Sequence, residues 1–301
     1  MLKKRTVILV AIEDTYKTIK VPDPATDAVL VGNPSYGTEA VRTIERENTT
    51  PALNKDQGIY GGSLRKISVE VENKGSGVAG VAPEFGDLLK ICGMSENIVA
   101  STSVAYEEAD ENIPSATIFY YEDGLLHKLA GCRGTANVSC ETGEKSIISF
   151  EITGHDKGTT DAPVPAAAYI STLPAPFINV SVNIGGFGPE ISKVDFDLGN
   201  TVATPASASD AEGYGQIVIT ERDMSGSFDP EATLLATKNW ENEWKTGAIQ
   251  TLSTGEVGSV AGNKYQLEMD VYYREISGGD RDGVLTNEIS CGVKAATITY
   301  T

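Results

Sequence analysis

The chain has 301 residues, of which 40% are hydrophobic, so it can bury a core as one large domain or as two domains of about 150 residues each. Lys and Arg total 24 against 42 Asp and Glu, which gives a formal net charge of −18 at pH 7. This charge argues against a protein that binds nucleic acid or anionic lipid by electrostatic attraction. The 31 glycines and 13 prolines are typical of β-structure with many turns.

The N-terminal stretch "MLKKRTVILVAIED" has basic residues before an apolar run, as a signal peptide does. The run from Val7 to Ile12 is short, however, and Glu13 and Asp14 stand where a small-residue cleavage site would be. We therefore predict a first β-strand here. No segment approaches the roughly 20 apolar residues of a membrane span, so we expect no membrane anchor.

Residues 13–62 form a long polar stretch with four prolines and little periodicity. A stretch of this length without regular structure is unusual inside a compact domain, and it predicts a loop or an arm. From Ile67 onward, apolar and polar residues alternate, which predicts a strand.

The stretch "PEFGDLLKICGMS", residues 83–95, has helical spacing instead. Phe85, Leu88, Leu89 and Cys92 stand at i, i+3, i+4 and i+7, so they form one apolar face. We predict a helix of about three turns, with Pro83 at its first position and a glycine closing it. A helix this short is marginal alone, so it should lie against a sheet.

After this helix, four alternating runs separated by glycine-containing turns predict antiparallel hairpins. The runs are "SATIFYY", "LLHKLA", "TANVSC" and "KSIISFEITG", with one of the turns placed near Gly131. Residues 156–176 are rich in Pro, Ala, Gly and Thr, which predicts a linker or an extended crossover.

The second half repeats this plan. Strands are predicted at "FINVSVNIGG", "KVDFDLGN" and "GQIVITERD", followed by a helix capped by Asp229 that ends at Gly247, with Trp240 and Trp244 on its apolar side. Four further strand-like runs complete the chain. We therefore predict a first module at residues 1–155 with an arm or loop at 13–62, a linker at 156–176, and a second, duplicated module at 177–301.

The sequence offers few groups for catalysis or metal binding. Its four cysteines form no CxxC pair and only two histidines are present, so we expect reduced structural thiols and no metal site. No phosphate-binding loop, nucleophile elbow or HExxH motif occurs. We expect no cofactor, no catalytic residue and no enzymatic activity.

The chain resembles the tail tube proteins of long-tailed bacteriophages. The resemblance rests on "PEFGDLLKICGMS", the stretch from "SATIFYY" to "SFEITG", "VDFDLGN" and "YGQIVITERD", which together span most of the chain. It implies a mainly β fold, an antiparallel β-sandwich flanked by a short helix, whose subunits form rings that stack as a hollow tube. Phe85, Leu88, Leu89 and Cys92 would pack that helix beside the sandwich.

The resemblance also implies a function. The chain would be a structural virion protein of a siphovirus-like tail, assembled in the host cytoplasm, through which phage DNA is ejected without tight binding. Tape-measure, tail terminator and distal tail proteins would be its partners. The candidate loop between rings contains Glu45, Arg46 and Leu53.

The excess of acidic residues suits such a conduit, because an anionic lumen would repel DNA phosphates. Candidate lumen residues are Glu70, Glu72, Glu268 and Asp270, although alternation alone does not say which face of each strand lines the lumen.

Two modules in one chain favour trimeric rings with pseudo-sixfold symmetry, whereas a peripheral second half would suit a hexamer. Two other functions stay open at this point: the tube protein of a contractile tail, and a secreted bacterial β-sandwich adhesin or carbohydrate-binding module.

Overall fold

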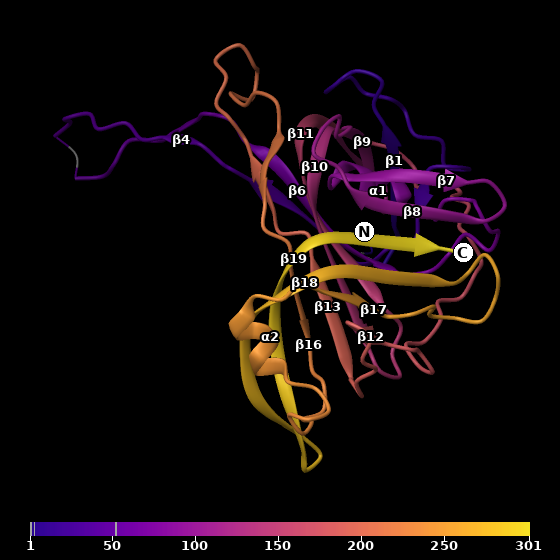
Figure 1. Cartoon of the computed structure of the whole chain (residues 1–301). Coiled ribbons are helices and arrows are strands. Elements are labelled where there is room, and N and C mark those ends of the chain that lie inside the picture. Colours follow the sequence, from indigo (N-terminus) through magenta and orange to yellow (C-terminus); the bar gives the residue numbers. More distant parts are fainter. Residues whose placement is uncertain (1, 3, 52) are drawn as a thin grey trace.

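We describe the fold from a computed structural model, which describes residue 2, residues 4–51 and residues 53–301 (Figure 1). The first half contains β1 (Thr6–Ile12), β2 (Ala28–Val29), β3 (Gly32–Glu39), β4 (Thr43–Ile44), β5 (Ile59–Tyr60), β6 (Leu64–Glu72), α1 (Gly86–Ile91), β7 (Met94–Val99), β8 (Ser103–Glu108), β9 (Ala116–Glu122), β10 (Leu125–Glu141) and β11 (Ile147–Asp161). The second half contains β12 (Asn183–Ile184), β13 (Lys193–Asp197), β14 (Asn200–Ala203), β15 (Val218–Arg222), β16 (Ser225–Phe228), α2 (Trp240–Thr246), β17 (Gln250–Ser253), β18 (Tyr265–Arg281) and β19 (Val284–Tyr300). The prediction of a mainly β, antiparallel fold with short helices is confirmed.

One sheet of 15 strands passes through both halves of the chain. Its central part runs β3-β6-β11-β10-β13-β16-β19-β18. We call these strands the central run, and it includes only residues 284–292 of β19, which pair with β16 at 289–292, and the paired residues 272–281 of β18. The two halves meet where β13 pairs with β10, from Asn137 opposite Asp197 to Glu141 opposite Lys193. They meet a second time where β8 pairs with β19. All of these pairs are antiparallel.

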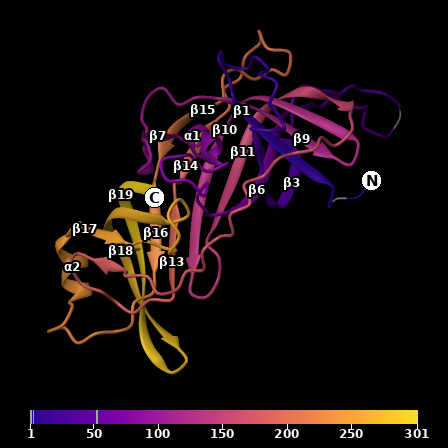
Figure 2. The same cartoon turned by 90° about the vertical axis from the view of Figure 1, so that its right-hand side faces the viewer.

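The connectivity of the two halves matches for most of their elements. The first half has the strand order β1-β9-β10-β11-β6-β3, and the second has β12-β17-β18-β19-β16-β13. The last long strand is β11 in the first half and β19 in the second, and it pairs with β6 and β16 respectively. A helix follows β6 and β16 along the chain, and a separate two-stranded hairpin precedes each of them. These hairpins are β4–β5 and β14–β15, and the second is labelled in Figure 2. Only β2 and the β7–β8 hairpin have no counterpart.

The main hydrophobic core lies on one side of the central run and draws on both halves. Buried side chains such as Val71, Val138 and Phe196 project from the run into it. Helix α1 contacts β1, β7 and β10. At the C-terminal end, Tyr300 of β19 packs edge-on against Phe85 with the ring centroids 5.9 Å apart, so apolar burial holds the halves together as well as strand pairing does.

Both helices are shorter than predicted. Helix α1 has six residues, because Pro83 and Glu84 lie outside its first turn and Phe85 is the N-cap. Helix α2 begins at Trp240, where the Asn239 side chain accepts a hydrogen bond from the amide of residue 242. The prediction that Asp229 caps this helix is wrong, because that carboxylate binds other backbone amides, as described below.

Four predictions about strands, turns and loops also need correction. Residues 13–62 contain β2 and β3, so only residues 40–62 leave the body of the protein. Gly131 makes no turn but a β-bulge with φ of 65°, so one strand, β10, runs through it. Within "FINVSVNIGG" only residues 183–184 are strand, and the last two predicted runs are the single strand β19.

The predicted linker is fixed against the first half. Strand β11 continues to Asp161, and the residues after it cross the surface as an extended strap. The Lys74 ammonium donates to the carbonyl of Ile170 at 3.0 Å, and the amide of Ile170 donates to Glu84 at 3.0 Å. Lys74 and Glu84 are themselves a buried ion pair, 3.6 Å apart.

Candidate assembly surfaces

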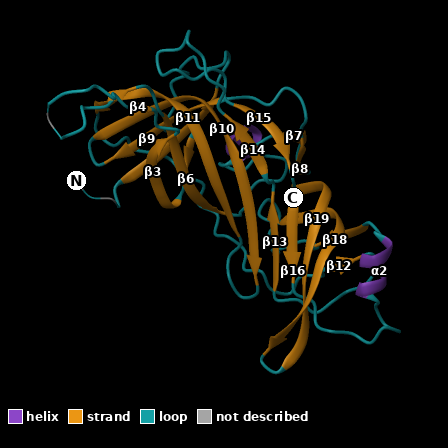
Figure 3. Cartoon of the chain, turned by 90° about the vertical axis from the view of Figure 1, so that its left-hand side faces the viewer, coloured by secondary structure: helices purple, strands orange, loops and turns teal. Residues whose placement is uncertain are grey.

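The face of the central run opposite the core is polar from one end to the other, and we call it the polar face. It arises because β6, β10, β11 and β13 alternate buried residues with exposed or half-buried polar ones. Its acidic members are Glu70, Glu72, Glu141, Glu151, Asp195, Asp197, Glu275 and Glu288. Figure 3 shows the run crossing the molecule from β3 to β18.

Cross-strand contacts order the side chains of this face. Asp195 accepts hydrogen bonds from Ser139 at 2.6 Å and from Ser227 at 3.2 Å, so one carboxylate spans three strands. Lys66 lies 2.8 Å from Glu151, and this hydrogen bond raises the pKa of the lysine. Lys145 and Lys193 pair with Glu72 and Glu288. Acidic groups still outnumber the lysines, so the face is anionic.

The structure brings only two of the four candidate lumen residues onto the polar face. Glu70 and Glu72 lie on β6, well inside the central run. Glu268 and Asp270 lie on the first part of β18, where that strand pairs with β17. Glu268 lies opposite Thr297, which also pairs with β8, so this part of β18 lies outside the central run.

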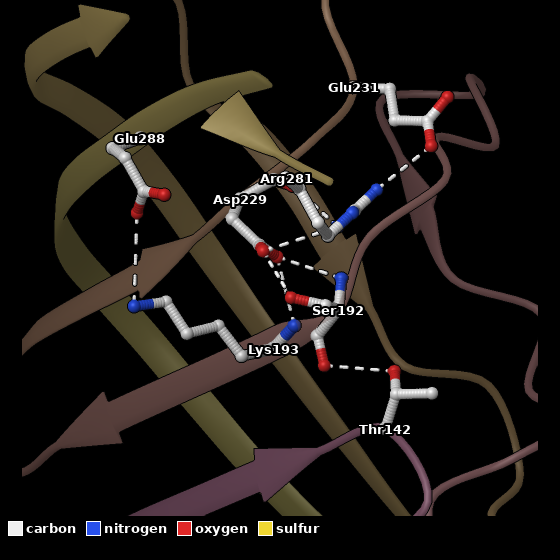
Figure 4. Close-up of polar contacts among 7 residues, drawn as sticks. All are labelled: Thr142, Ser192, Lys193, Asp229, Glu231, Arg281 and Glu288. Carbon is white, nitrogen blue, oxygen red and sulfur yellow. Dashed lines mark hydrogen bonds and ion pairs between the residues drawn. The ribbon is translucent and has the colours of Figure 1, made fainter. Parts of the chain in front are cut away.

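A buried carboxylate fastens the end of the seam between the halves (Figure 4). Asp229 follows β16 and is 5% exposed. It accepts hydrogen bonds from the amides of Ser192 at 2.8 Å and Lys193 at 2.9 Å, and it pairs with Arg281 at 3.2 Å. The carbonyl of Ser192 accepts a hydrogen bond from Thr142 at 2.9 Å. Asp229 therefore ties β16 and the start of β13 to the β18–β19 hairpin, next to the end of β10.

The segment at residues 40–62 projects from the body as a hairpin arm (Figure 1). Its strands β4 and β5 pair only with one another among the described residues. The predicted inter-ring residues Glu45, Arg46 and Leu53 all lie in its exposed outer loop. Leu53 is fully exposed, and Ile44 and Tyr60 are more than half exposed. Such a cluster of apolar groups away from the body is typical of a segment that contacts a partner.

The arm is anchored at its base by the hairpin of the other half. The Arg42 guanidinium donates to the carbonyl of Gly213 at 2.9 Å and lies 3.9 Å above the Tyr214 ring. The Tyr60 hydroxyl donates to Glu212 at 2.7 Å. No sequence pattern predicts this contact, since its partners are about 150 to 170 positions apart.

The packing residues predicted for the short helix, Phe85, Leu88, Leu89 and Cys92, are all buried in the main core. All four cysteines are free, buried thiols, and burial raises the pKa of each; that of Cys291 is raised to about 12. Such thiols lack the thiolate form that reacts with electrophiles.

The histidine at position 155 is buried rather than solvated. Its Nε2 lies 3.1 Å from the Tyr16 hydroxyl, and its Nδ1 has no hydrogen-bond partner in the described structure. Burial, helped by the nearby charge of Lys17, lowers the pKa of His155 to about 4. Glu13, the first residue of the predicted polar stretch, is a second buried polar group and accepts hydrogen bonds from the Ser115 hydroxyl and the Gly131 amide.

No group of three or more His, Cys, Asp or Glu side chains that could hold a metal ion occurs among the described residues. Within the same residues, no helix is long and apolar enough to cross a membrane.

Comparison with known proteins gives the family. A model of phage tail tube proteins matches residues 3–295, which is nearly the whole chain. The chain belongs to the phage tail tube protein family. Members are structural components of the virion tail that assemble with one another and with other tail proteins, and the family is not one of enzymes. No curated protein matches the chain.

Proposed function

We propose that this tail tube protein forms closed rings that stack into a hollow tube, through which double-stranded DNA leaves the virion. The observation that carries the proposal is the central run, a continuous antiparallel sheet whose outermost strands are open to further pairing. Joining such edges between copies removes the unpaired edges that a lone sheet exposes. The full barrel then has one polar and one apolar face, with the core outside.

We place the polar face toward the lumen. Its acidic residues repel the phosphates of DNA, so the genome can slide without binding. The opposite face cannot line a water-filled channel, because it carries the buried core. Glu70 and Glu72 would then line the lumen, whereas Glu268 and Asp270 would lie in the outer layer beside β17.

We propose a ring of three chains with pseudo-sixfold symmetry. The matched connectivity of the two halves supports an internal duplication, with modules at residues 1–155 and 177–301 joined by the strap that includes 156–176. Each chain then contributes two similar units, which in a hexamer would come from two chains. The β4–β5 arm and the β14–β15 hairpin would alternate around the ring, with the longer arm reaching the next ring.

A non-contractile, siphovirus-like tail is the assembly we propose, built in the host cytoplasm with tape-measure, terminator and distal tail proteins. Cryo-electron microscopy of concentrated purified protein tests the central claim. We expect hollow rings or tubes whose end views show three strong and three weaker features. Sixfold-identical features with a peripheral second half would overturn the trimer, and a monomer at high concentration would overturn the assembly itself.

A further inference from the structure

The seam between the two halves shows how one unit of this fold joins the next. Near the tip of the β10–β11 hairpin, the edge of β10 facing away from β11 accepts β13. Asn137 lies opposite Asp197, and Val138 lies opposite Phe196 with both side chains in the core. The other part of the same β10 edge pairs with β9. The edge of β10 away from β11 thus pairs with β9 along one part and with β13 of the other half along the other part.

The second half has the same long strand without the incoming partner. By connectivity, β18 corresponds to β10 and β17 to β9. Along β18, strand β17 pairs with residues 268–271 and with no later residue in the described structure. From Tyr272 to Arg281, the edge of β18 away from β19 has no strand partner within the described part of the chain. The side chains of Glu275 and Ser277 on this segment are exposed.

The counterpart of β13 is β3, and it too has one free edge. Strand β13 pairs with β16 on one side and β10 on the other, whereas β3 pairs with β6 alone in the described structure. Ser35 on β3 is exposed, and a Cβ added at Gly37 would meet nothing within 4 Å. Pro34 removes one donor from this edge, at the irregularity between Gly32 and Ser35, and the amides from Ser35 onward are retained.

We propose that β3 of one copy pairs antiparallel with residues 272–281 of β18 in the next copy, so that the seam between subunits repeats the β10–β13 seam within each subunit. This inference rests on the proposed ring assembly and names its contact. The two edges lie at opposite ends of the central run, so the contact is head-to-tail and closes into a ring when the rotation fits.

The internal seam also supplies a register. Ser35 lies opposite Ser68 of β6, as Asp197 lies opposite Ser225 of β16. Glu275 lies opposite Ser290 of β19, as Asn137 lies opposite Ser149 of β11.

Two buried pairs at the ends of β6 and β16 show which residues of the two halves correspond to each other. These are Val71 with Ile148 and Phe228 with Ile289. Ser35 of one copy is therefore expected opposite Glu275 of the next, and a slip of two residues would bring it opposite Ser277.

Cysteine cross-linking tests this contact in assembled protein. The double variants Ser35→Cys/Glu275→Cys and Ser35→Cys/Ser277→Cys place thiols at exposed positions, so folding should be retained. Directly opposed residues in a sheet are close enough for a disulfide. The four native thiols are buried and should not compete. The matched control is Ser35→Cys/Ser259→Cys, whose second site is exposed but lies in the loop between β17 and β18, outside both proposed edges.

After mild oxidation of assembled rings, at least one of the first two variants should give covalently linked chains on a non-reducing gel, ending at three chains. The control and each single variant should give none above background. Rings that form normally, as seen by microscopy, but cross-link in neither variant would overturn this seam and leave the ring assembly standing. Failure of the unmodified protein to form rings would instead remove the proposed function.

Discussion

At the scale of single residues, a buried carboxylate holds together the part of the second half that meets β10. The Asp229 carboxylate has four partner groups: the Ser192 amide and hydroxyl, the Lys193 amide and the Arg281 guanidinium. The two amides lie at the start of β13, the strand that pairs with β10. Removing the buried carboxylate leaves those donors without an acceptor and Arg281 without its buried partner. Both effects lower the free energy of unfolding, because the site is enclosed. The sequence alone suggested a helix cap for this residue, since an Asp-Pro pair is also typical of a helix start.

We expect Asp229→Ala to lower the free energy of unfolding of the unassembled chain by roughly 2–4 kcal/mol. Urea denaturation followed by circular dichroism measures this. Asp223→Ala is the control, because Asp223 pairs with Arg274 on the surface and its loss should change the urea midpoint little. Equal midpoints for the two variants would show that the Asp229 contacts contribute no special stability.

His155 should make folding sensitive to acid. Because burial lowers its pKa to about 4 in the folded state, the unfolded chain, with a pKa near 6.5, binds the proton first as pH falls. The stability contributed by the neutral ring is therefore complete above about pH 6.5 and is lost between about pH 6.5 and 4.

The test compares urea midpoints of the native chain and His155→Phe across this range. We expect the native chain to lose more stability on acidification than the variant, by up to about 3 kcal/mol at pH 4. Acidic residues titrate in both proteins, so only the difference reports on His155. Parallel pH curves would contradict the assignment.

At the scale of elements, the hairpin arm is the part of the fold least explained by the subunit alone. Leu53 in its outer loop is fully exposed, whereas its base is held by the β14–β15 hairpin. A rigid base under an exposed tip suits a segment that contacts another ring.

Replacing residues 45–58 by Asn-Gly, a two-residue turn suited to joining β4 to β5, should leave ring formation intact and abolish stacking into long tubes. The milder variant Leu53→Asp should shorten tubes. Val78→Asp is the matched control, since Val78 is an apolar residue exposed elsewhere in the first half. Tube lengths are measured by negative-stain microscopy, and unchanged lengths in the loop replacement would rule out a stacking role.

At the scale of the whole molecule, the arrangement of the sheet decides which acidic residues act together. If the polar face lines the lumen, Glu70→Lys/Glu72→Lys should make assembled tubes retain short DNA duplexes. We expect an affinity gain on the order of tenfold that disappears as salt is raised.

Glu268→Lys/Asp270→Lys is the matched comparison, since it makes the same charge change on the part of β18 that pairs with β17. Fluorescence anisotropy with labelled duplex in preassembled tubes measures binding, and nuclease protection reports whether the DNA lies inside. A larger gain in protected DNA for the second pair would place the lumen on the other layer.

The sequence by itself determined the β class, the antiparallel hairpins and the apolar face of α1, because these depend on local alternation and helical spacing. It also carried the family, through motifs spread along the chain. It could not show that Gly131 is a bulge or that Asp229 binds the start of β13 and Arg281, since both depend on partners that are not sequence neighbours.

Only the tertiary structure decided which carboxylates share one face and which strand edges stay open. Alternation tells that two residues point to opposite sides of a strand, but pairing between distant strands decides what lies on each side. That is why Glu70 and Glu268 looked alike in the sequence and lie in different parts of the sheet, one beside β11 and the other beside β17.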